Sequence, residues 1–214
     1  LNSSNIKSDL FFDISPNPRE DEVSNGVKKF KDGNHDSIIA IGGGSAMDGG
    51  KLICLTANND VPLRDFEFEL TPPIISKDNP FPKIITIPTT AGTGAETEIS
   101  AMVTYLKEGM KFCMWHPDVR PSLALLDPEL TIGLPANLTA WTGADALIHG
   151  IEGYCVPGFN PMCDGAALEG LSLISKSLVT AVEDPSNIVA RGGMHVGSCL
   201  AGISFLKGLG LVHA

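Results

Sequence analysis

Residues 141–154 read Trp-Thr-Gly-Ala-Asp-Ala-Leu-Ile-His-Gly-Ile-Glu-Gly-Tyr, and the interpretation of the whole chain starts from this stretch. Its apolar side chains recur at the spacing of one helix face: Ala144, Leu147, Ile148 and Ile151. Asp145 and His149 lie four positions apart within it. Because residues at that spacing share a helix face one turn apart, a carboxylate and an imidazole there can hold one metal ion from the same side.

A second histidine, His213, follows an apolar run of small residues near the end of the chain. An Asp–His pair at helical spacing is more often a solvated surface pair, and a single histidine says little by itself. Here both pieces lie in nearly uncharged sequence, where a buried ionisable group must be paired or must bind a metal. We therefore predict that Asp145, His149 and His213 are ligands of one metal site. No catalytic residue beyond these ligands is assignable.

The first part of the chain predicts alternating strands and helices. Apolar runs predict strands over residues 10–14, 37–41, 83–88, 99–106, 110–115 and 123–126, with a hairpin turn at 107–109. Helical periodicity predicts helices over residues 20–31 and 46–57. The continuous apolar run at 37–41 is typical of a strand covered on both faces, as in a parallel sheet.

From Pro135 onward the pattern changes. Helices are predicted over residues 135–154, 161–182 and about 186–206, and no convincing strand remains. We therefore predict an α/β fold class, with a Rossmann-like, parallel-sheet nucleotide-binding domain over residues 1–134. An all-α metal-binding domain over residues 135–214 follows it, with a cleft between the two. Both ends read like places where a longer protein was cut, so we expect both domains to be incomplete.

A glycine-rich turn at residues 42–45 joins a predicted strand to a predicted helix. In that arrangement, backbone N–H groups and a helix N-terminus can meet a phosphate. A Walker loop would need glycine in place of Ser45 and a hydroxyl residue in place of Leu52. The Rossmann fingerprint would need glycine in place of Met47. The turn therefore indicates a phosphate or dinucleotide site with another fingerprint, or a plain tight turn.

A second loop, at residues 89–96, is dense in hydroxyls and glycines and follows the strand predicted at 83–88. Open α/β sheets bind their ligands at the carboxyl ends of their strands. The loop therefore fits phosphate or ribose contacts, with a mobile loop as the alternative.

Composition excludes several partners. The net charge is −10 and the pI is about 4.8, with no cluster of Lys and Arg, which argues against nucleic acid and against anionic membrane surfaces. The five cysteines are odd in number and form no CxxC pair, so neither a disulfide framework nor a thiolate zinc site is indicated. A reducing, cytoplasmic location is therefore expected.

With these segments in hand, the chain resembles the iron-containing (group III) alcohol dehydrogenases. The resemblance covers essentially all 214 residues and rests on five motifs in the family's order. They are Gly42-Gly43-Gly44-Ser45-x-x-Asp48-x-x-Lys51, Pro88-Thr89-Thr90-Ala91-Gly92-Thr93-Gly94-x-Glu96, Asp127-Pro128-x-Leu130-Thr131 with Pro135, Gly143-x-Asp145-Ala146-x-x-His149-x-x-Glu152, and Gly208-x-Gly210-x-x-His213. Each motif alone is weak, but the five in order are specific.

The resemblance implies a metal-dependent oxidoreductase that interconverts a small primary alcohol or diol and its aldehyde with NAD or NADP. It implies that Gly43, Gly44 and Ser45 contact the pyrophosphate, with Asp48 following on the helix. It also implies a second cofactor loop with Thr89, Thr90 and Thr93. Lys111 would lie near the nicotinamide ribose. Asp145, His149 and His213 match three of the family's four metal ligands. Such a ligand set is usual for Fe(II), and zinc accepts the same atoms.

The departures from the family pattern lie at the two ends. The fourth ligand, a histidine, would lie beyond Ala214, and the acidic residue that reads the ribose would lie ahead of Leu1. We therefore expect these 214 residues alone to bind metal poorly and to be inactive. The alternatives are a relative of glycerol dehydrogenase or dehydroquinate synthase, and a non-catalytic nucleotide-binding fragment. The sequence leaves open the substrate, NAD against NADP, iron against zinc, and whether the protein is a homo-oligomer.

Overall fold

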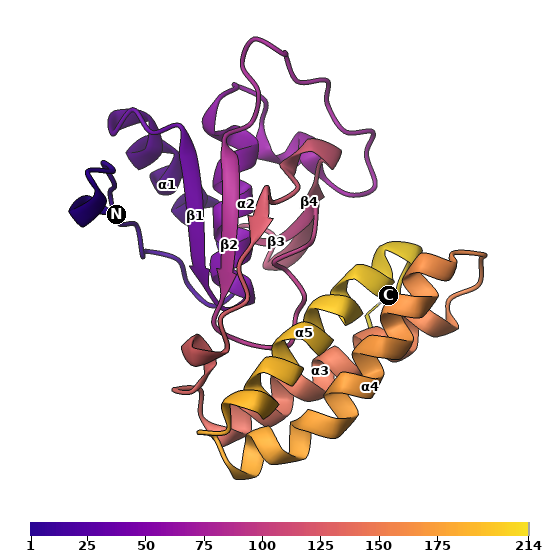
Figure 1. Ribbon diagram of the computed structural model, residues 1–214. Coiled ribbons are helices and arrows are strands. Elements are labelled where there is room, and N and C mark those ends of the chain that lie inside the picture. Colours follow the sequence, from indigo (N-terminus) through magenta and orange to yellow (C-terminus); the bar gives the residue numbers. More distant parts are fainter. Residues whose placement is uncertain (214) are drawn as a thin grey trace. The chain divides into compact units, whose positions relative to one another are not determined.

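The computed structural model describes residues 1–213 (Figure 1). Its α-helices are α1 (Glu20–Asp32), α2 (Gly44–Ala57), α3 (Ala136–Cys155), α4 (Pro161–Glu183) and α5 (Ile188–Ser204). Its strands are β1 (Ser37–Gly42), β2 (Lys83–Pro88), β3 (Ser100–Tyr105), β4 (Met110–Trp115) and β5 (Leu123–Ala124). The 3-10 helices are η1 (Asn2–Ser4), η2 (Leu63–Phe66), η3 (Pro117–Val119), η4 (Pro128–Thr131) and η5 (Phe205–Lys207). The predicted α/β order followed by helices is confirmed.

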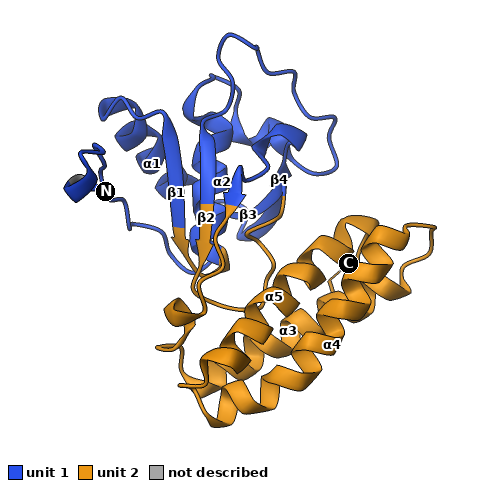
Figure 2. Cartoon of the chain, in the orientation of Figure 1, with its two compact units in different colours: residues 1–40, 45–85, 99–123 blue, residues 41–44, 86–98, 124–214 orange. Residues whose placement is uncertain are grey.

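The chain divides into two compact units, shown in different colours in Figure 2. Unit 1 comprises residues 1–40, 45–85 and 99–123, and unit 2 comprises residues 41–44, 86–98 and 124–214. The helices predicted after Pro135 therefore lie in unit 2, together with the ends of β1 and β2 and the loop that follows β2. The domain boundary between residues 134 and 135 stays a prediction.

The central sheet has the strand order β1-β2-β5. Ser122 and Leu125 donate backbone hydrogen bonds to the carbonyls of Ile84 and Thr86, at 2.8 and 2.9 Å. The partners rise together along both strands, as they do in a parallel pair. The parallel sheet predicted from the apolar runs is therefore confirmed.

Helix α2 packs closely on the sheet because glycine faces the strands. A Cβ added at Gly50 would lie 2.7 Å from Cβ of Ala40 and 3.4 Å from Cδ1 of Ile84, so a larger residue would push the helix away. The core of unit 1 forms around α2 and the β3–β4 hairpin, and its buried members are Val23, Phe30, Leu52, Ile53, Cys54, Leu55, Ala57, Phe66, Ala101, Val103, Met114 and Val119. The hairpin pairs antiparallel, as predicted, with Thr104 opposite Lys111.

Two strand predictions were wrong in part. Residues 10–14 form no strand, because Phe11 and Ile14 instead pack against the glycine faces of α1 and α2. Strand β1 forms where predicted but is not covered on both faces. Ala40 is buried on one face, whereas Ile39 and Ile41 on the other face are 39% and 58% exposed. An apolar run shows that a strand could be buried on both faces, but whether it is buried depends on the elements that pack against it.

In unit 2, helices α3, α4 and α5 pack against one another. Small residues allow the close contacts, since a Cβ at Gly170 on α4 would lie 2.9 Å from the carbonyl oxygen of Gly197 on α5. The buried core members of this unit are Ala91, Ala146, Ile174, Ala181, Ala190, Met194 and Ala201. The predicted helix boundaries hold to within about two residues, because Asn160 and Asn187 cap α4 and α5 by accepting backbone N–H groups.

By length and composition alone, α4 is the one helix among the described residues that would suffice to cross a membrane, with a mean hydropathy of 1.2. It packs against α3 and α5 as a member of the bundle. Core helices of soluble proteins have the same composition, so α4 gives no independent reason to place the chain in a membrane.

Candidate metal centre

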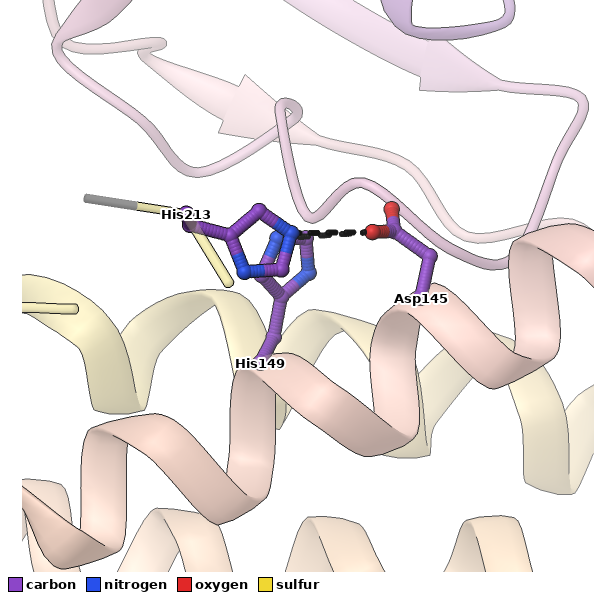
Figure 3. Close-up of side chains that lie close together, drawn as sticks. All are labelled: Asp145, His149 and His213. Atoms are coloured by element: carbon purple, nitrogen blue, oxygen red, sulfur yellow. Dashed lines mark hydrogen bonds and ion pairs between the residues drawn. The ribbon is translucent and has the colours of Figure 1, made fainter. Parts of the chain in front are cut away.

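Helix α3 carries two of the three predicted ligands. Asp145 and His149 project from successive turns of the same helix face (Figure 3). A carboxylate oxygen, Oδ1 of Asp145, lies 3.8 Å from Nε2 of His149. His149 is buried, at 6% exposure, whereas the Asp145 side chain is one third exposed. The local geometry predicted from the four-residue spacing is therefore present.

The third predicted ligand reaches the same place from the end of the chain. Helix α5 ends at Ser204, the turn η5 follows it, and Gly208 then adopts a φ of +127°, which a side chain would disfavour. Beyond that turn, Nε2 of His213 lies 3.1 Å from Oδ1 of Asp145. The rings of His149 and His213 lie 4.3 Å apart between centroids. The three residues predicted from sequence are thus brought together.

The three donor atoms fit a divalent cation. One ligand atom from each of Asp145, His149 and His213 lies within 4.8 Å of the other two. Metal–ligand distances of about 2.0–2.2 Å place neighbouring donors about 3–3.5 Å apart, so a small inward movement of the side chains would complete the coordination. Carboxylate and imidazole donors suit iron and zinc alike.

The other nitrogen of each imidazole already has a partner. Nδ1 of His149 faces the backbone carbonyl of Gly92 at 3.4 Å. Nδ1 of His213 lies 2.7 Å from Oε2 of Glu152. Both rings therefore direct Nε2 toward Asp145, and both Nδ1 contacts are of the kind that orients metal-ligating histidines.

The electrostatics differ between the two histidines. Burial lowers the pKa of His149, the Asp145 carboxylate opposes that shift, and the neighbouring His213 lowers the pKa further. Partial burial also acts to lower the pKa of His213, but hydrogen bonds to Glu152 and Asp145 outweigh it and raise the pKa. The backbone N–H of Val212, assisted by His213, lowers the pKa of Glu152. At neutral pH the Glu152 carboxylate is therefore ionised beside His213.

Several predicted cofactor residues lie in the same unit as the three ligands. The backbone N–H of Thr89 donates to the carbonyl of Gly42 at 2.8 Å, which joins the glycine turn to the second loop. A Cβ at Gly43 would lie 3.4 Å from Cγ2 of Thr90, and one at Gly44 would lie 2.9 Å from Cγ2 of Thr93. The two motifs that the sequence separates by about fifty residues therefore contact each other, and that they bind a nucleotide stays a prediction.

The second loop also packs on α3, which carries Asp145 and His149, and on α5. A Cβ at Gly92 would lie 2.7 Å from the backbone oxygen of Thr142 on α3. Gly94, with a φ of +68°, would place a Cβ 2.6 Å from Cα of Gly202 on α5. Since the same Gly92 carbonyl faces His149, the loop and the ligand cluster are positioned by one set of contacts.

The remaining predicted cofactor residues lie in unit 1. The hydroxyl of Ser45 accepts the backbone N–H of Asn17 at 3.1 Å. Asp48 is 3.7 Å from Nζ of Lys51. Burial raises the pKa of Asp48, against the opposing effects of Lys51, the backbone of Met102 and the charge of exposed Lys111. Contacts of Ser45, Asp48 and Lys111 with a nucleotide stay predictions. Asp48 also forms an ion pair within the protein, with Lys51.

Comparison with known proteins decides the family. A family model described as iron-containing alcohol dehydrogenase matches residues 1–128, and one for the C-terminal part of that family matches residues 139–214. The chain belongs to the iron-containing alcohol dehydrogenase family. The resemblance stated from the five motifs is therefore confirmed, as is the fold class.

Individual relatives support the same family assignment. The NAD-dependent methanol dehydrogenase of Bacillus methanolicus is 37% identical over 206 residues, which is 96% of this chain and 53% of the relative. The 1,3-propanediol dehydrogenase of Citrobacter freundii is 37% identical over 215 residues, covering 100% and 54%. A crystal structure of 1,3-propanediol oxidoreductase matches with a TM-score of 0.93 at 36% identity, over 99% of this chain and 55% of that chain. The chain spans about half the length of these relatives.

Sequence reasoning gave no role to two residues that the structure singles out. Glu152 appears in the α3 motif, and its contact with His213 depends on where the chain turns after η5. His195 on α5 is a core histidine, at 1% exposure. Neither of its ring nitrogens has a hydrogen-bond partner among the described residues. The signal in the sequence was a histidine in a helix whose one charged residue is Arg191.

Proposed function

We propose that this chain forms the nucleotide- and metal-binding part of an NAD-dependent dehydrogenase that interconverts a small primary alcohol or diol and its aldehyde. The observation that carries the proposal is the convergence of Asp145, His149 and His213 in a chain of this family. The names of the relatives, an NAD-dependent methanol dehydrogenase and a 1,3-propanediol dehydrogenase, support the cofactor and the substrate class. A cytoplasmic location and a homo-oligomeric assembly belong to the same proposal.

The residues divide the work between two groups. The ligand cluster would hold Fe(II), or Zn, and the family's description favours iron. When bound, the cation supplies Lewis-acid stabilisation to the alcohol oxygen, and the nicotinamide accepts the hydride. The lining formed by Gly43, Gly44, Thr90 and Thr93 would hold the dinucleotide, because it offers small residues, hydroxyls and backbone N–H groups to a pyrophosphate. The Gly92 carbonyl holds His149 in the orientation that leaves Nε2 for the cation.

Cation binding tests the metal half of the proposal. The chain is titrated with zinc alone and, without oxygen, with Fe(II) alone, and Asp145→Asn and His149→Gln are measured beside it. Each ligand variant is expected to bind at least tenfold more weakly, since a lost ligand costs more than the orienting contacts that alone change affinity about 10–100-fold. His35→Gln is the matched control, because that histidine bonds to Asp9 in unit 1. Equal affinity in all four proteins would overturn the metal assignment.

Nucleotide binding and turnover test the other half. Titration with NADH and with NADPH, followed by nicotinamide fluorescence, is expected to give saturable binding that is weakened by Gly44→Val at the contact with Thr93. NAD-linked oxidation of methanol and 1,3-propanediol by a metal-loaded protein of the relatives' full length is the final test, because the 214 residues alone are expected to be inactive. Turnover of glycerol alone would instead favour the glycerol dehydrogenase alternative. Absence of nucleotide binding would overturn the nucleotide half of the proposal, and nucleotide binding without turnover would favour the non-catalytic nucleotide-binding fragment.

A further inference from the structure

Glu152 binds the segment that delivers the last ligand. It lies on α3, seven residues after Asp145 and three after His149, and it is 7% exposed. Its Oε1 accepts the backbone N–H of Val212 at 2.6 Å, and its Oε2 lies 2.7 Å from Nδ1 of His213. One buried carboxylate therefore uses both of its oxygens on consecutive residues of the chain's final segment.

The shape of that segment is adapted to Glu152. A Cβ added at Gly210 would lie 3.2 Å from Oε1 of Glu152, tighter than most side-chain contacts. The glycine lets the backbone pass close to the carboxylate, so that two hydrogen bonds form at once. The contact is therefore a built feature of the turn and not an incidental surface pair.

The chemistry of the pair fixes the tautomer of His213. An ionised carboxylate is an acceptor only, so Nδ1 of a neutral imidazole beside it must carry the hydrogen. The hydrogen is then absent from Nε2, whose electron pair faces Oδ1 of Asp145 at 3.1 Å. In the neutral ring these two electron pairs converge on one point, which a proton fills in the imidazolium and a metal ion fills when it binds. Glu152 thus prepares His213 to bind a cation at the atom that faces Asp145.

We propose that Glu152 is the positioning residue of the metal centre, which holds His213 in the Nδ1–H tautomer and directs its Nε2 at the cation. The proposal rests on the proposed metal-binding function. Helix α3 then provides three functional groups on one face, two ligands and the group that orients the third. Glu152 acts through His213 and is not itself a ligand, because Oε1 and Oε2 are both occupied on the far side of the ring.

Glu152→Gln is the decisive variant because it keeps the shape and removes one acceptor. The glutamine oxygen can accept from Val212 or from His213 but not from both, and its NH2 group then opposes the remaining N–H. Zinc and Co(II) affinities, measured by competition with a chelator, are expected to fall about 10–100-fold. Glu169→Gln, an exposed glutamate on α4 with the same change of charge, is the control and is expected to bind like the parent.

A double-mutant cycle separates positioning from general stability. In a His213→Ala background, Glu152→Gln is expected to cause no further loss of cation affinity, because the group through which it acts is gone. An unchanged loss in that background would show that Glu152 acts on the fold and would overturn the proposal. So would parental cation affinity in Glu152→Gln itself.

Nitrogen NMR provides a readout that needs neither metal nor a variant. In alkaline, metal-free buffer the 15N shifts of the His213 ring are expected to report a hydrogen on Nδ1. A ring protonated at Nε2 would overturn the proposal even if Glu152→Gln failed to fold. If the parent protein binds no cation but shows the Nδ1–H tautomer, the proposed metal function fails while the Glu152–His213 contact stands.

Discussion

Substituting alanine for Gly94 tests the packing that positions the loop at residues 89–96. Gly94 lies in the left-handed region with a φ of +68°. An added Cβ would lie 2.6 Å from Cα and 3.2 Å from the backbone nitrogen of Gly202 on α5. Both atoms belong to backbone, so no side chain can rotate away to make room. The loop or the helix must therefore move.

The expected cost follows from two separate terms. A non-glycine residue in the left-handed region costs about 1–2 kcal/mol, and overpacking of a tight contact costs about 1–3 kcal/mol. Gly94→Ala should therefore destabilise unit 2 by about 2–5 kcal/mol. Gly202→Ala meets the same contact from the other side, at 2.8 Å from Cα of Gly94. Gly202 has an ordinary helical φ, and alanine is favoured over glycine in a helix by about 1 kcal/mol. The net cost of Gly202→Ala should therefore be only about 0–2 kcal/mol.

Urea unfolding followed by Trp141 fluorescence gives the assay, since Trp141 is the tryptophan of unit 2. Trp115→Phe removes the other tryptophan from every protein compared. The control is Gly165→Ala on α4, where nothing lies within 4 Å of the added Cβ, and it should stabilise by about 0.5–1 kcal/mol. If Gly94→Ala unfolds within about 0.5 kcal/mol of its parent, the close approach of loop and helix is wrong.

Three further predictions concern buried polar groups. His195→Leu should stabilise the chain by about 1–3 kcal/mol in urea unfolding, because it removes two buried nitrogens that have no hydrogen-bond partner among the described residues. If the variant is less stable than the parent, the imidazole ring has a hydrogen-bond partner after all. Burial lowers the pKa of His195; the charge of Asp127 acts to raise it, and the charge of Arg191 lowers it further. As the pH falls, the unfolded chain therefore takes up a proton on this histidine before the folded chain does. The free energy of unfolding of the parent should fall below about pH 6.5, and that of His195→Leu should fall less over the same range. Parallel curves of stability against pH for the two proteins would contradict this. Lys207→Met removes an ammonium 2.6 Å from Asp164 and 3.2 Å from the carbonyl of Tyr154. It should cost about 1–3 kcal/mol and speed amide hydrogen exchange over the residues that follow η5, whereas unchanged exchange there would show that Lys207 does not anchor the segment.

Local patterns predicted the elements that depend on neighbours in sequence. The Asp145–His149 pair followed from the helical repeat alone, because the spacing and the face are properties of one helix. The start of α4 followed from Asn160-Pro161, and Asn160 caps it; the polar residues 184–186 placed the start of α5 about two residues early, because Asn187 caps that helix. His213 was added because it follows an apolar run and matches the last of the five motifs, since nothing local relates it to residues more than sixty positions earlier.

The failures have a common physical cause. Residues 10–14 carry the apolar content of a strand, but a strand also needs a neighbouring backbone, and Phe11 and Ile14 contact helices instead. The run at β1 could line two covered faces, but only the face with Ala40 is buried among the described residues. In each case the residue type was read correctly and its partner was not.

The same limit explains why Glu152 received no role. At seven residues from Asp145 it lies on the same helical stripe, so spacing alone would have allowed it to be a further ligand. The two nitrogens of an imidazole point in different directions, however, so a carboxylate bonded to Nδ1 cannot also bind the cation that Nε2 binds. The structure puts Glu152 at Nδ1 of His213 and Asp145 at Nε2. Asp145 and Glu152 lie on one helix face but have different roles, because they contact different nitrogens of the His213 ring. Which nitrogen each one contacts depends on the backbone turn after η5, about sixty residues further along the chain.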